Sequence, residues 1–152
     1  MSGLYDAAAH AVIASNRMLV LVITASLSAQ LLKVPAHFLV RRQWDWGRAV
    51  GAGGMPSAHS AMVTALATAV GYVRGWHSAL FAIVTVFALI VLYDAVGIRQ
   101  TVGRQGRFLN QMQQEPAWGD WPRVHLPETT GHTPAEVLAG AVWGILLTIL
   151  FY

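Results

Sequence analysis

Residues 78–96 read SALFAIVTVFALIVLYDAV, and no charged residue interrupts this stretch before Asp94. A helix needs about 20 apolar residues, with a range of about 17–25, to cross the hydrocarbon core of a bilayer. Three further apolar stretches occupy residues 11–32, 58–73 and 134–152. The stretch at 58–73 is short for a span, so we expect it to be tilted, buried among its neighbours or to begin within the membrane.

The composition of the whole chain agrees with lipid as its solvent. Of the 152 residues, 55% are hydrophobic and 11% are charged, whereas a soluble domain has about 45–50% and about 25%. A soluble chain this short could not bury so much apolar surface. We therefore predict an all-α fold, a polytopic membrane helical bundle with about four transmembrane helices in a single integral membrane domain, residues 1–152. Residues 97–114 are expected to hold a short amphipathic helix, and residues 116–127, with three prolines, a loop.

Basic residues predict the topology of these helices. Eight of the ten Lys and Arg residues lie in the two long connections between spans. Four spans place both connections on one face, and the positive-inside rule makes that face cytoplasmic, with both termini outside the cell membrane. Cations kept for binding phosphate would bias this count without reporting topology. The eight are Lys33, Arg41, Arg42, Arg48, Arg99, Arg104, Arg107 and Arg123.

The net charge of +3 bears on the expected partners. The basic residues form no exposed stripe and no nucleic-acid-binding motif is present, so we expect no nucleic-acid partner. Membrane lipid with anionic head groups, or a phosphorylated substrate, fits the charge better. The chain has no cysteine, which excludes a thiol nucleophile. Because four short spans make a thin bundle, we hypothesise a homodimer.

Four tryptophans flank the predicted spans: Trp44, Trp46, Trp118 and Trp121. Tryptophan is enriched where the bilayer meets water, so these residues suit an interfacial belt. Contact with a substrate is the alternative interpretation of the same four residues.

The first candidate site is Gly53-Gly54-Met55-Pro56-Ser57-Ala58-His59-Ser60. Two glycines allow the backbone to approach a ligand closely. Pro56 and Ser57 then open a helix, whose free N–H groups and positive dipole end attract phosphate. His59 sits one turn into that helix, where it can donate a proton to a leaving oxygen. The alternative is a glycine turn, an ordinary helix cap and a core histidine.

The second candidate site is Gly131-His132-Thr133-Pro134-Ala135-Glu136. His132 and Glu136 are four residues apart and share a helix face. A carboxylate that accepts from one imidazole nitrogen leaves the other nitrogen free to attack an electrophile. Thr133 and Glu136, with Pro134 at the first helical position, also make a good capping box. We expect that one carboxylate cannot satisfy both geometries fully.

Charged residues at the ends of two spans complete the set of candidates. Lys33 either snorkels to the interface or clamps a phosphate oxygen. Asp94 ends an apolar run, where an ionisable group needs a partner, and Arg99 is the nearest candidate. Arg99, with Arg104 and Arg107, could supply the charge that stabilises a phosphoryl transition state. The alternative for Asp94 and Arg99 is a structural ion pair.

Taken in order, Lys33, Pro56-Ser57-Ala58-His59 and His132-x-x-x-Glu136 resemble a known three-part signature. It is that of the superfamily of type 2 phosphatidic acid phosphatases and vanadium-dependent haloperoxidases. The strings GGMPSAHS, YDAVGIRQ and GHTPAEV look like its divergent branch, whose members are small membrane proteins related to acid phosphatases and haloperoxidases. The resemblance covers about residues 10–150.

The resemblance implies a metal-free lipid phosphatase that needs no cofactor. Its substrate would be a lipid phosphomonoester or pyrophosphate. His132 would attack phosphorus and form a phosphohistidine, Glu136 would orient His132, and His59 would protonate the leaving group and later activate water. The phosphoryl oxygens would be held by Ser57, nearby backbone N–H groups such as that of Gly54, Lys33 and an arginine, Arg99 or Arg104.

The sequence departs from the family pattern in three ways. Ala58 stands where the family has glycine, and Glu136 where it has aspartate. Leu126 and Pro127 occupy the place of the usual Ser-Arg phosphate clamp. Two other hypotheses therefore stay open. One is a lipid-phosphate-binding protein without catalysis, for transport, sensing or assembly. The other is a metal-dependent hydrolase using Asp94, His59, His132 and Glu136 on magnesium or zinc.

Overall fold

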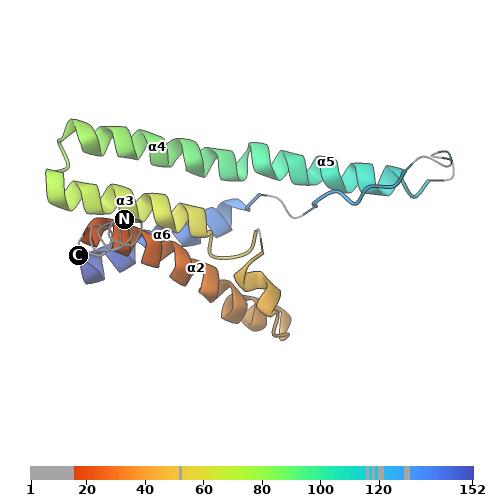
Figure 1. Ribbon diagram of the computed structural model, residues 1–152, viewed down its shortest axis with the longest axis horizontal. Coiled ribbons are helices and arrows are strands. Elements are labelled where there is room, and N and C mark those ends of the chain that lie inside the picture. The colour runs from red at the N-terminus through yellow and green to blue at the C-terminus, as the bar shows by residue number, and fades with distance from the viewer. Residues whose placement is uncertain (1–15, 52, 116, 118, 120–121, 129–130) are drawn as a thin grey trace, which may run out of the picture.

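The computed structural model describes residues 16–51, 53–115, 117, 119, 122–128 and 131–152 (Figure 1). Throughout these residues the regular secondary structure is helical, which confirms the all-α helical bundle. The elements in chain order are α2 (Arg17–Arg41), the 3₁₀ turn η1 (Trp46–Ala49), α3 (Ala58–Arg74), α4 (Ala79–Val96), α5 (Ile98–Met112) and α6 (Pro134–Phe151).

Helix α3 is the centre of the bundle and packs against α2, α4 and α6. Its contact with α6 depends on small residues. A Cβ atom at Gly140 would overlap the backbone of Ser57, and one at Gly144 would overlap the carbonyl oxygen of Ala61. Glycines spaced four apart let two helices approach closely in a membrane. Because 140 pairs with 57 and 144 with 61, α3 and α6 run parallel and begin at the same end.

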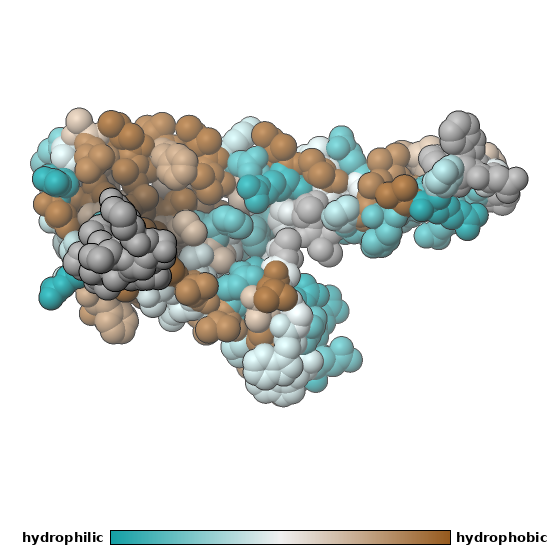
Figure 2. Space-filling view, viewed as in Figure 1, coloured by the Kyte–Doolittle hydropathy of each residue, from teal (hydrophilic) through white to brown (hydrophobic). Residues whose placement is uncertain are grey.

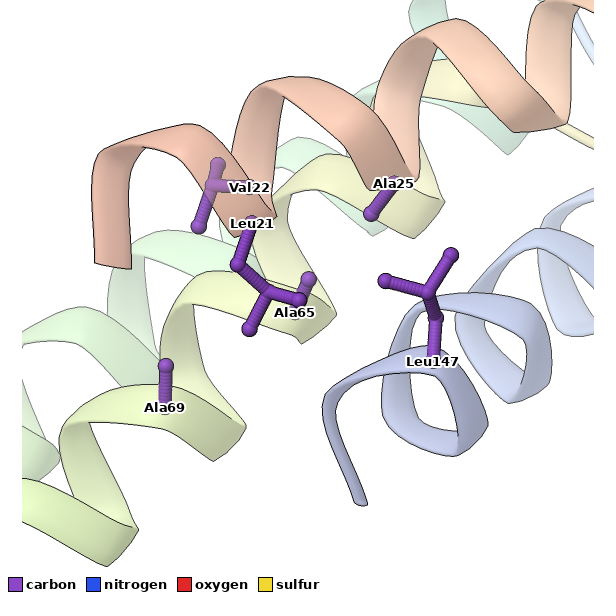
Figure 3. Packing of buried hydrophobic residues seen from close by; sticks show 6 residues of the cluster. All are labelled: Leu21, Val22, Ala25, Ala65, Ala69 and Leu147. Carbon is purple, nitrogen blue, oxygen red and sulfur yellow. The ribbon is translucent and has the colours of Figure 1, made fainter. Parts of the chain in front are cut away.

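Hydroxyl groups and a compact core secure the three helices α2, α3 and α6. Thr148 of α6 donates to the carbonyl oxygen of Ala65 at 3.4 Å. Figure 3 shows Leu147 of α6 pointing toward Ala25 of α2, and Leu21 of α2 lying over α3 at Ala65. Leu21 lies towards the start of α2, while Ala29, further along, packs on the first turns of α3. The helices α2 and α3 are therefore antiparallel.

The bounds of the first helix, α2, differ from the predicted ones, chiefly at its C-terminal end. Its N-cap is Asn16, whose Oδ1 accepts from the backbone nitrogen of Leu19 at 3.1 Å; the predicted residues 11–15 lie outside the described part of the chain. The predicted end at Leu32 is wrong, because α2 continues through Pro35 to Arg41. The residues after Lys33 are again mostly apolar, so a single buried cation does not end the helix. It ends where Arg42 adopts a left-handed conformation with φ of 57°.

The end of α4 and the starts of α3 and α6 lie together at one end of the bundle, and α2 passes this end and continues to Arg41. There the backbone nitrogen of His132, just before α6, donates to the carbonyl oxygen of Ala95 in α4 at 3.0 Å. Both long connections therefore lie at the same end, as the four predicted spans require. The side of the membrane that this end faces stays a prediction.

Three stretches of the described chain are long and apolar enough to cross a membrane: residues 17–41, 79–112 and 134–151. The second joins α4 to α5, which lie end to end as one long rod (Figure 1). Helix α3 has 17 residues, about 26 Å at 1.5 Å per residue, and so falls short of the bilayer core of about 30 Å. Its ten buried residues confirm that this short helix is buried among its neighbours.

Helix α5 leaves the bundle and is amphipathic, as predicted. Figure 2 shows apolar surface over α4 and more hydrophilic surface along α5. The chain returns along α5, where the Asn110 side chain donates to the carbonyl oxygen of Leu126 and accepts from its backbone nitrogen, both at 2.9 Å. Gly106 allows this approach, since a Cβ atom there would overlap the carbonyl oxygen of Pro127. The return segment is thereby fixed beside the site end of the bundle.

Two tryptophans of the predicted belt, Trp44 and Trp46, lie in the described residues and follow the end of α2. Trp44 stacks on Phe38 with ring centroids 4.4 Å apart and on Trp46 at 6.2 Å. Both Trp44 and Trp46 are exposed, as an interfacial belt requires. Trp118 and Trp121, the other two predicted members, lie outside the described residues.

Candidate active site

His132 and Glu136 meet as the sequence predicts. The Nδ1 atom of His132 lies 3.2 Å from Oε2 of Glu136. The same oxygen accepts from the backbone nitrogen of Thr133 at 3.0 Å, and the Thr133 hydroxyl accepts from the backbone nitrogen of Glu136 at 3.3 Å. The capping box and the histidine contact therefore coexist. The expectation that one carboxylate cannot serve both was wrong, because His132 directly precedes the cap and its ring lies over the first turn of α6.

The contact with Glu136 sets the tautomer of His132. An ionised carboxylate can only accept hydrogen bonds, so we assign the proton between the carboxylate of Glu136 and the imidazole to Nδ1 of His132. In the neutral imidazole the other ring nitrogen, Nε2, then carries a lone pair. This is the arrangement that a histidine nucleophile needs.

Backbone contacts hold His132 in place. His132 is only 7% exposed, and its backbone nitrogen donates a hydrogen bond to the carbonyl oxygen of Ala95. Gly131 precedes it with φ of 94°, and a Cβ atom there would overlap the backbone of Gln100 in the first turn of α5. Only glycine fits this close, left-handed position. The chain is thereby wedged between α5 and α6 with little freedom for the imidazole.

Burial lowers the pKa of His132 below its ordinary value, and the nearby charges of Lys33 and His59 lower it further. The hydrogen bond and the negative charge of Glu136 act in the opposite direction, but the net shift of the pKa is downward. His132 is therefore neutral at pH 7, with its Nε2 lone pair available. The influence of Lys33 and His59 also shows that both lie near His132.

The start of α3 carries the other candidate histidine. Ser57 is fully buried, and its hydroxyl caps α3 by accepting from the backbone nitrogen of Ser60 at 3.3 Å and its hydroxyl at 2.9 Å. The backbone nitrogen of Ser57 donates to the carbonyl oxygen of Glu136 at 3.0 Å, which ties the two site helices together. His59 is exposed in the same turn. The cap role of Ser57 is confirmed, while its contact with phosphate stays a prediction.

Lys33 lies beneath the glycine loop that precedes α3. It is only 4% exposed, which does not fit a lysine that snorkels to the interface. Its Nζ donates to the carbonyl oxygen of Gly51 at 3.3 Å, and Gln30 donates to the same oxygen at 3.2 Å. A Cβ atom on Gly54, where φ is 84°, would lie 3.7 Å from the Lys33 side chain. The lysine thus supports the loop that forms one wall of the site.

Four of the predicted site residues, His132, Glu136, Gly54 and Arg104, line a cleft of about 380 Å³. His59, Ser57 and Lys33 are not part of its lining. Three walls meet there: the start of α6, the glycine loop and one face of α5. The cations Arg48, Arg104 and Arg107 line the cleft, and the return segment contributes the carboxylate of Glu128. The lining residues are Arg48, Gly53, Gly54, Gln100, Arg104, Arg107, Glu128, Gly131, His132, Thr133 and Glu136.

The two predicted arginines have different places. Arg104 lines the cleft and donates to Oε1 of Gln100 at 3.0 Å. Arg99 is outside the lining and pairs with Asp94, with Nε 2.7 Å from Oδ2. The structural ion pair considered for Asp94 and Arg99 is therefore present. It occupies the end of the apolar run, where an unpaired carboxylate would be costly.

Sequence reasoning named Arg104 and Arg107 as sources of charge but missed Gln100 and Glu128 in this lining. Arg107 lies 3.8 Å from Glu128, and Arg48 lies 3.2 Å from Asp45, so these two of the three cleft arginines have acidic partners. Gln100, Arg104 and Arg107 follow the spacing i, i+4, i+7 of one helix face, and this signal could have placed all three together. No such signal exists for Glu128, which is brought in by the return segment.

The metal hypothesis requires a cluster of ligand side chains, and none is present among the residues that the structure describes. Within them, no group of three or more His, Asp and Glu residues is close enough to hold an ion. Asp94, one of its four proposed ligands, is paired with Arg99 instead.

Comparisons with known proteins identify the family of the chain and a relative that is a membrane protein. The family model described as the Divergent PAP2 family matches residues 14–147. A curated relative from Bacillus subtilis (strain 168), named uncharacterized membrane protein YuiD, is 40% identical over 140 residues. The match covers 84% of this chain and 89% of that protein. No solved structure matches the chain.

Proposed function

Since the chain belongs to the Divergent PAP2 family, we propose that it is a membrane lipid phosphatase that works through a phosphohistidine. Its substrate is a phosphomonoester or pyrophosphate on a lipid. The observation that carries this proposal is the His132–Glu136 pair, with Nδ1 of His132 held 3.2 Å from Oε2 of Glu136, at the edge of a cleft lined by arginines.

In the first step the Nε2 lone pair of His132 attacks phosphorus, and the bond between phosphorus and the lipid oxygen breaks. His59, in its protonated form, gives its proton to that leaving oxygen. Glu136 accepts from Nδ1–H and stabilises the positive charge that develops on the ring. The products of this step are a dephosphorylated lipid (or a lipid monophosphate, if the substrate is a pyrophosphate) and phosphohistidine.

In the second step water attacks the phosphohistidine. His59, now neutral, takes a proton from the water, and the bond between phosphorus and Nε2 breaks. Inorganic phosphate leaves, and both histidines return to their starting protonation states. His59 is exposed at the start of α3, so water and the leaving group can reach it.

The cleft arginines are proposed to hold the phosphoryl oxygens. Arg48, Arg104 and Arg107 line it, and guanidinium groups bind phosphate through paired N–H donors. Their present partners are carboxylates and an amide, which a phosphate oxygen can displace. They stand in for the clamp absent at Leu126 and Pro127, because the return segment that contains those residues packs on the helix bearing Arg104 and Arg107.

One observation favours a second function, binding of a lipid phosphate without turnover. Leu126 and Pro127 pack against α5 through their backbones and offer no side chain to a phosphate. A protein of this kind would bind phosphomonoester lipids saturably and release no phosphate.

The test is phosphate release by the purified protein from a panel of lipid phosphates, with EDTA present. His132→Ala is compared with His77→Ala, which removes an exposed histidine from the turn between α3 and α4 at the opposite end of the bundle. We expect turnover by wild type and by His77→Ala, and none by His132→Ala. A folded wild type that binds these lipids but releases no phosphate would establish the binding function instead. A parallel assay without EDTA tests the metal hypothesis, which predicts phosphate release only when EDTA is left out.

A further inference from the structure

A groove runs between α4 and α6 on the lipid-facing side of the bundle. It has a volume of about 730 Å³, and its lining side chains are apolar except for the Tyr93 hydroxyl. The α4 wall includes Ile90 and Val96, and the α6 wall includes Pro134 and Ala141. Both helices pack mainly on α3 rather than on each other, which leaves the space between them open.

The groove ends beside the proposed nucleophile. Val96 and Pro134 form its end wall, and Pro134 follows His132 by two residues. The neighbour of Val96, Ala95, accepts the hydrogen bond from the backbone nitrogen of His132. The apolar groove and the charged cleft therefore abut at the single segment that carries His132.

The length of the groove corresponds to one leaflet. On α4 it extends from Val86 to Val96, about 15 Å at 1.5 Å per residue. The hydrocarbon core of a bilayer is about 30 Å thick, so the groove reaches about to the midplane. A lipid whose phosphate lies at the site end keeps its chains in that same half of the bilayer.

We infer that the groove between α4 and α6 binds a hydrocarbon chain of the lipid whose phosphate occupies the cleft. This inference rests on the proposed function and makes membrane lipids with a long acyl or prenyl chain its preferred substrates. Water-soluble phosphoesters use the cleft alone. The lipid reaches His132 from within the bilayer, along α4 and α6.

Two other apolar hollows fit this role less well. One lies at the opposite end of the bundle, where Arg17, Phe151 and Tyr152 line it, far from the cleft along the helix axis. The other follows the far side of α6 past Ala139 and has Met55 as its only wall outside that helix. The groove between α4 and α6 has a helix on each side and ends at His132.

The first experiment fills the groove. Ala141→Leu adds side-chain volume between α4 and α6, and Ala139→Leu adds the same volume on the other side of α6 as a matched control. With a long-chain phosphatidate in vesicles, we expect Ala141→Leu to raise KM by about tenfold. Hydrolysis of a water-soluble phosphatidate with very short chains stays unchanged in both variants. An effect on both substrates, or on Ala139→Leu rather than Ala141→Leu, would overturn the inference.

The second experiment does not depend on turnover. A phosphatidate with a photoactivatable acyl chain is crosslinked to the protein in vesicles, beside a phosphatidylcholine that carries the same chain. We expect phosphatidate to label α4 and α6 at the groove in excess, and Ala141→Leu to abolish that excess. Equal labelling by both lipids, or crosslinks between two copies of the chain across the groove, would contradict the inference. Groove labelling without phosphate release would sink only the phosphatase proposal.

Discussion

His132 and Glu136 are joined through one carboxylate oxygen, which lies 3.2 Å from Nδ1 of the imidazole and also accepts from the helix cap. Oε2 of Glu136 thus takes part in the N-terminal cap of helix α6 and also sets the tautomer of the proposed nucleophile, His132. The two duties can be separated, because capping needs only an acceptor oxygen whereas stabilising an imidazolium needs a charge.

Glu136→Gln keeps an acceptor oxygen and removes the charge. We expect turnover to fall by about 10²–10⁴-fold while the thermal midpoint hardly changes. Glu136→Ala removes both and also costs about 1 kcal/mol of stability through the lost cap. Phosphate release and thermal unfolding in detergent are measured on both variants. Equal turnover in wild type and Glu136→Gln would show that the charge has no catalytic role.

The pH dependence follows from the lowered pKa of His132. A nucleophile must be neutral, so the loss of rate that belongs to His132 occurs as pH falls through its pKa, whereas the need for a protonated His59 acts on the other limb of the profile. We expect the acidic limb of kcat/KM that belongs to His132 to lie below the ordinary histidine value of about 6.5. Glu136→Gln removes the two influences that raise the pKa, so this limb moves to still lower pH. A limb that moves upward in Glu136→Gln would contradict the assignment.

The cleft arginines and an arginine at the opposite end of the bundle are expected to behave differently. Arg104→Ala or Arg107→Ala removes a charge from the cleft, with an expected loss of about 10²–10³-fold in turnover. Arg74→Ala is the matched control, since this exposed arginine ends α3 at the opposite end of the bundle. Comparable turnover in Arg104→Ala, Arg107→Ala and Arg74→Ala would remove the arginines from the mechanism.

Close packing of α3 on α6 aligns the two halves of the site. Gly144→Val would press a side chain onto the carbonyl oxygen of Ala61, and overpacking of this kind costs about 1–3 kcal/mol. We expect lower thermal stability and lower turnover together. Ala139→Val, on another face of α6, serves as the control, and equal stability of the two variants would speak against the close contact.

Membrane sidedness is open to labelling because the chain has no cysteine. Gln105→Cys places one thiol on α5 at the site end, and His77→Cys places one in the turn between α3 and α4. The distribution of Lys and Arg predicts that an impermeant reagent added outside intact cells labels His77→Cys and spares Gln105→Cys. The reverse pattern would mean that the site cations reflect phosphate binding rather than topology.

Local signals in the sequence predicted most helix boundaries. Ser57 and Thr133 cap α3 and α6 through the bonds that their residue types favour, and both helices begin where expected. The end of α2 was missed because Lys33 resembles a terminus, although its burial and its bond to Gly51 keep it inside the helix. A buried charge with a partner cannot be distinguished from an exposed one by sequence alone.

The site was predicted in outline but not in its full lining. His132 and Glu136 are neighbours on one helix, so spacing alone places them together. Arg104 and Arg99 are close in sequence yet point to different partners, because the helical turn sends one to the cleft and the other to Asp94. Glu128 enters through a return segment whose path depends on Asn110 and Gly106, and that tertiary contact leaves no local pattern.

The central claim is that phosphate passes through His132. The most direct measurement mixes the purified protein with a lipid phosphate in EDTA, quenches at alkaline pH within one turnover, and locates the modified residue by mass spectrometry. We predict a phosphate adduct on His132 that is absent in His132→Ala and still forms in His77→Ala. Phosphate release by a protein with no adduct on His132, or with the adduct on another residue, would contradict the account.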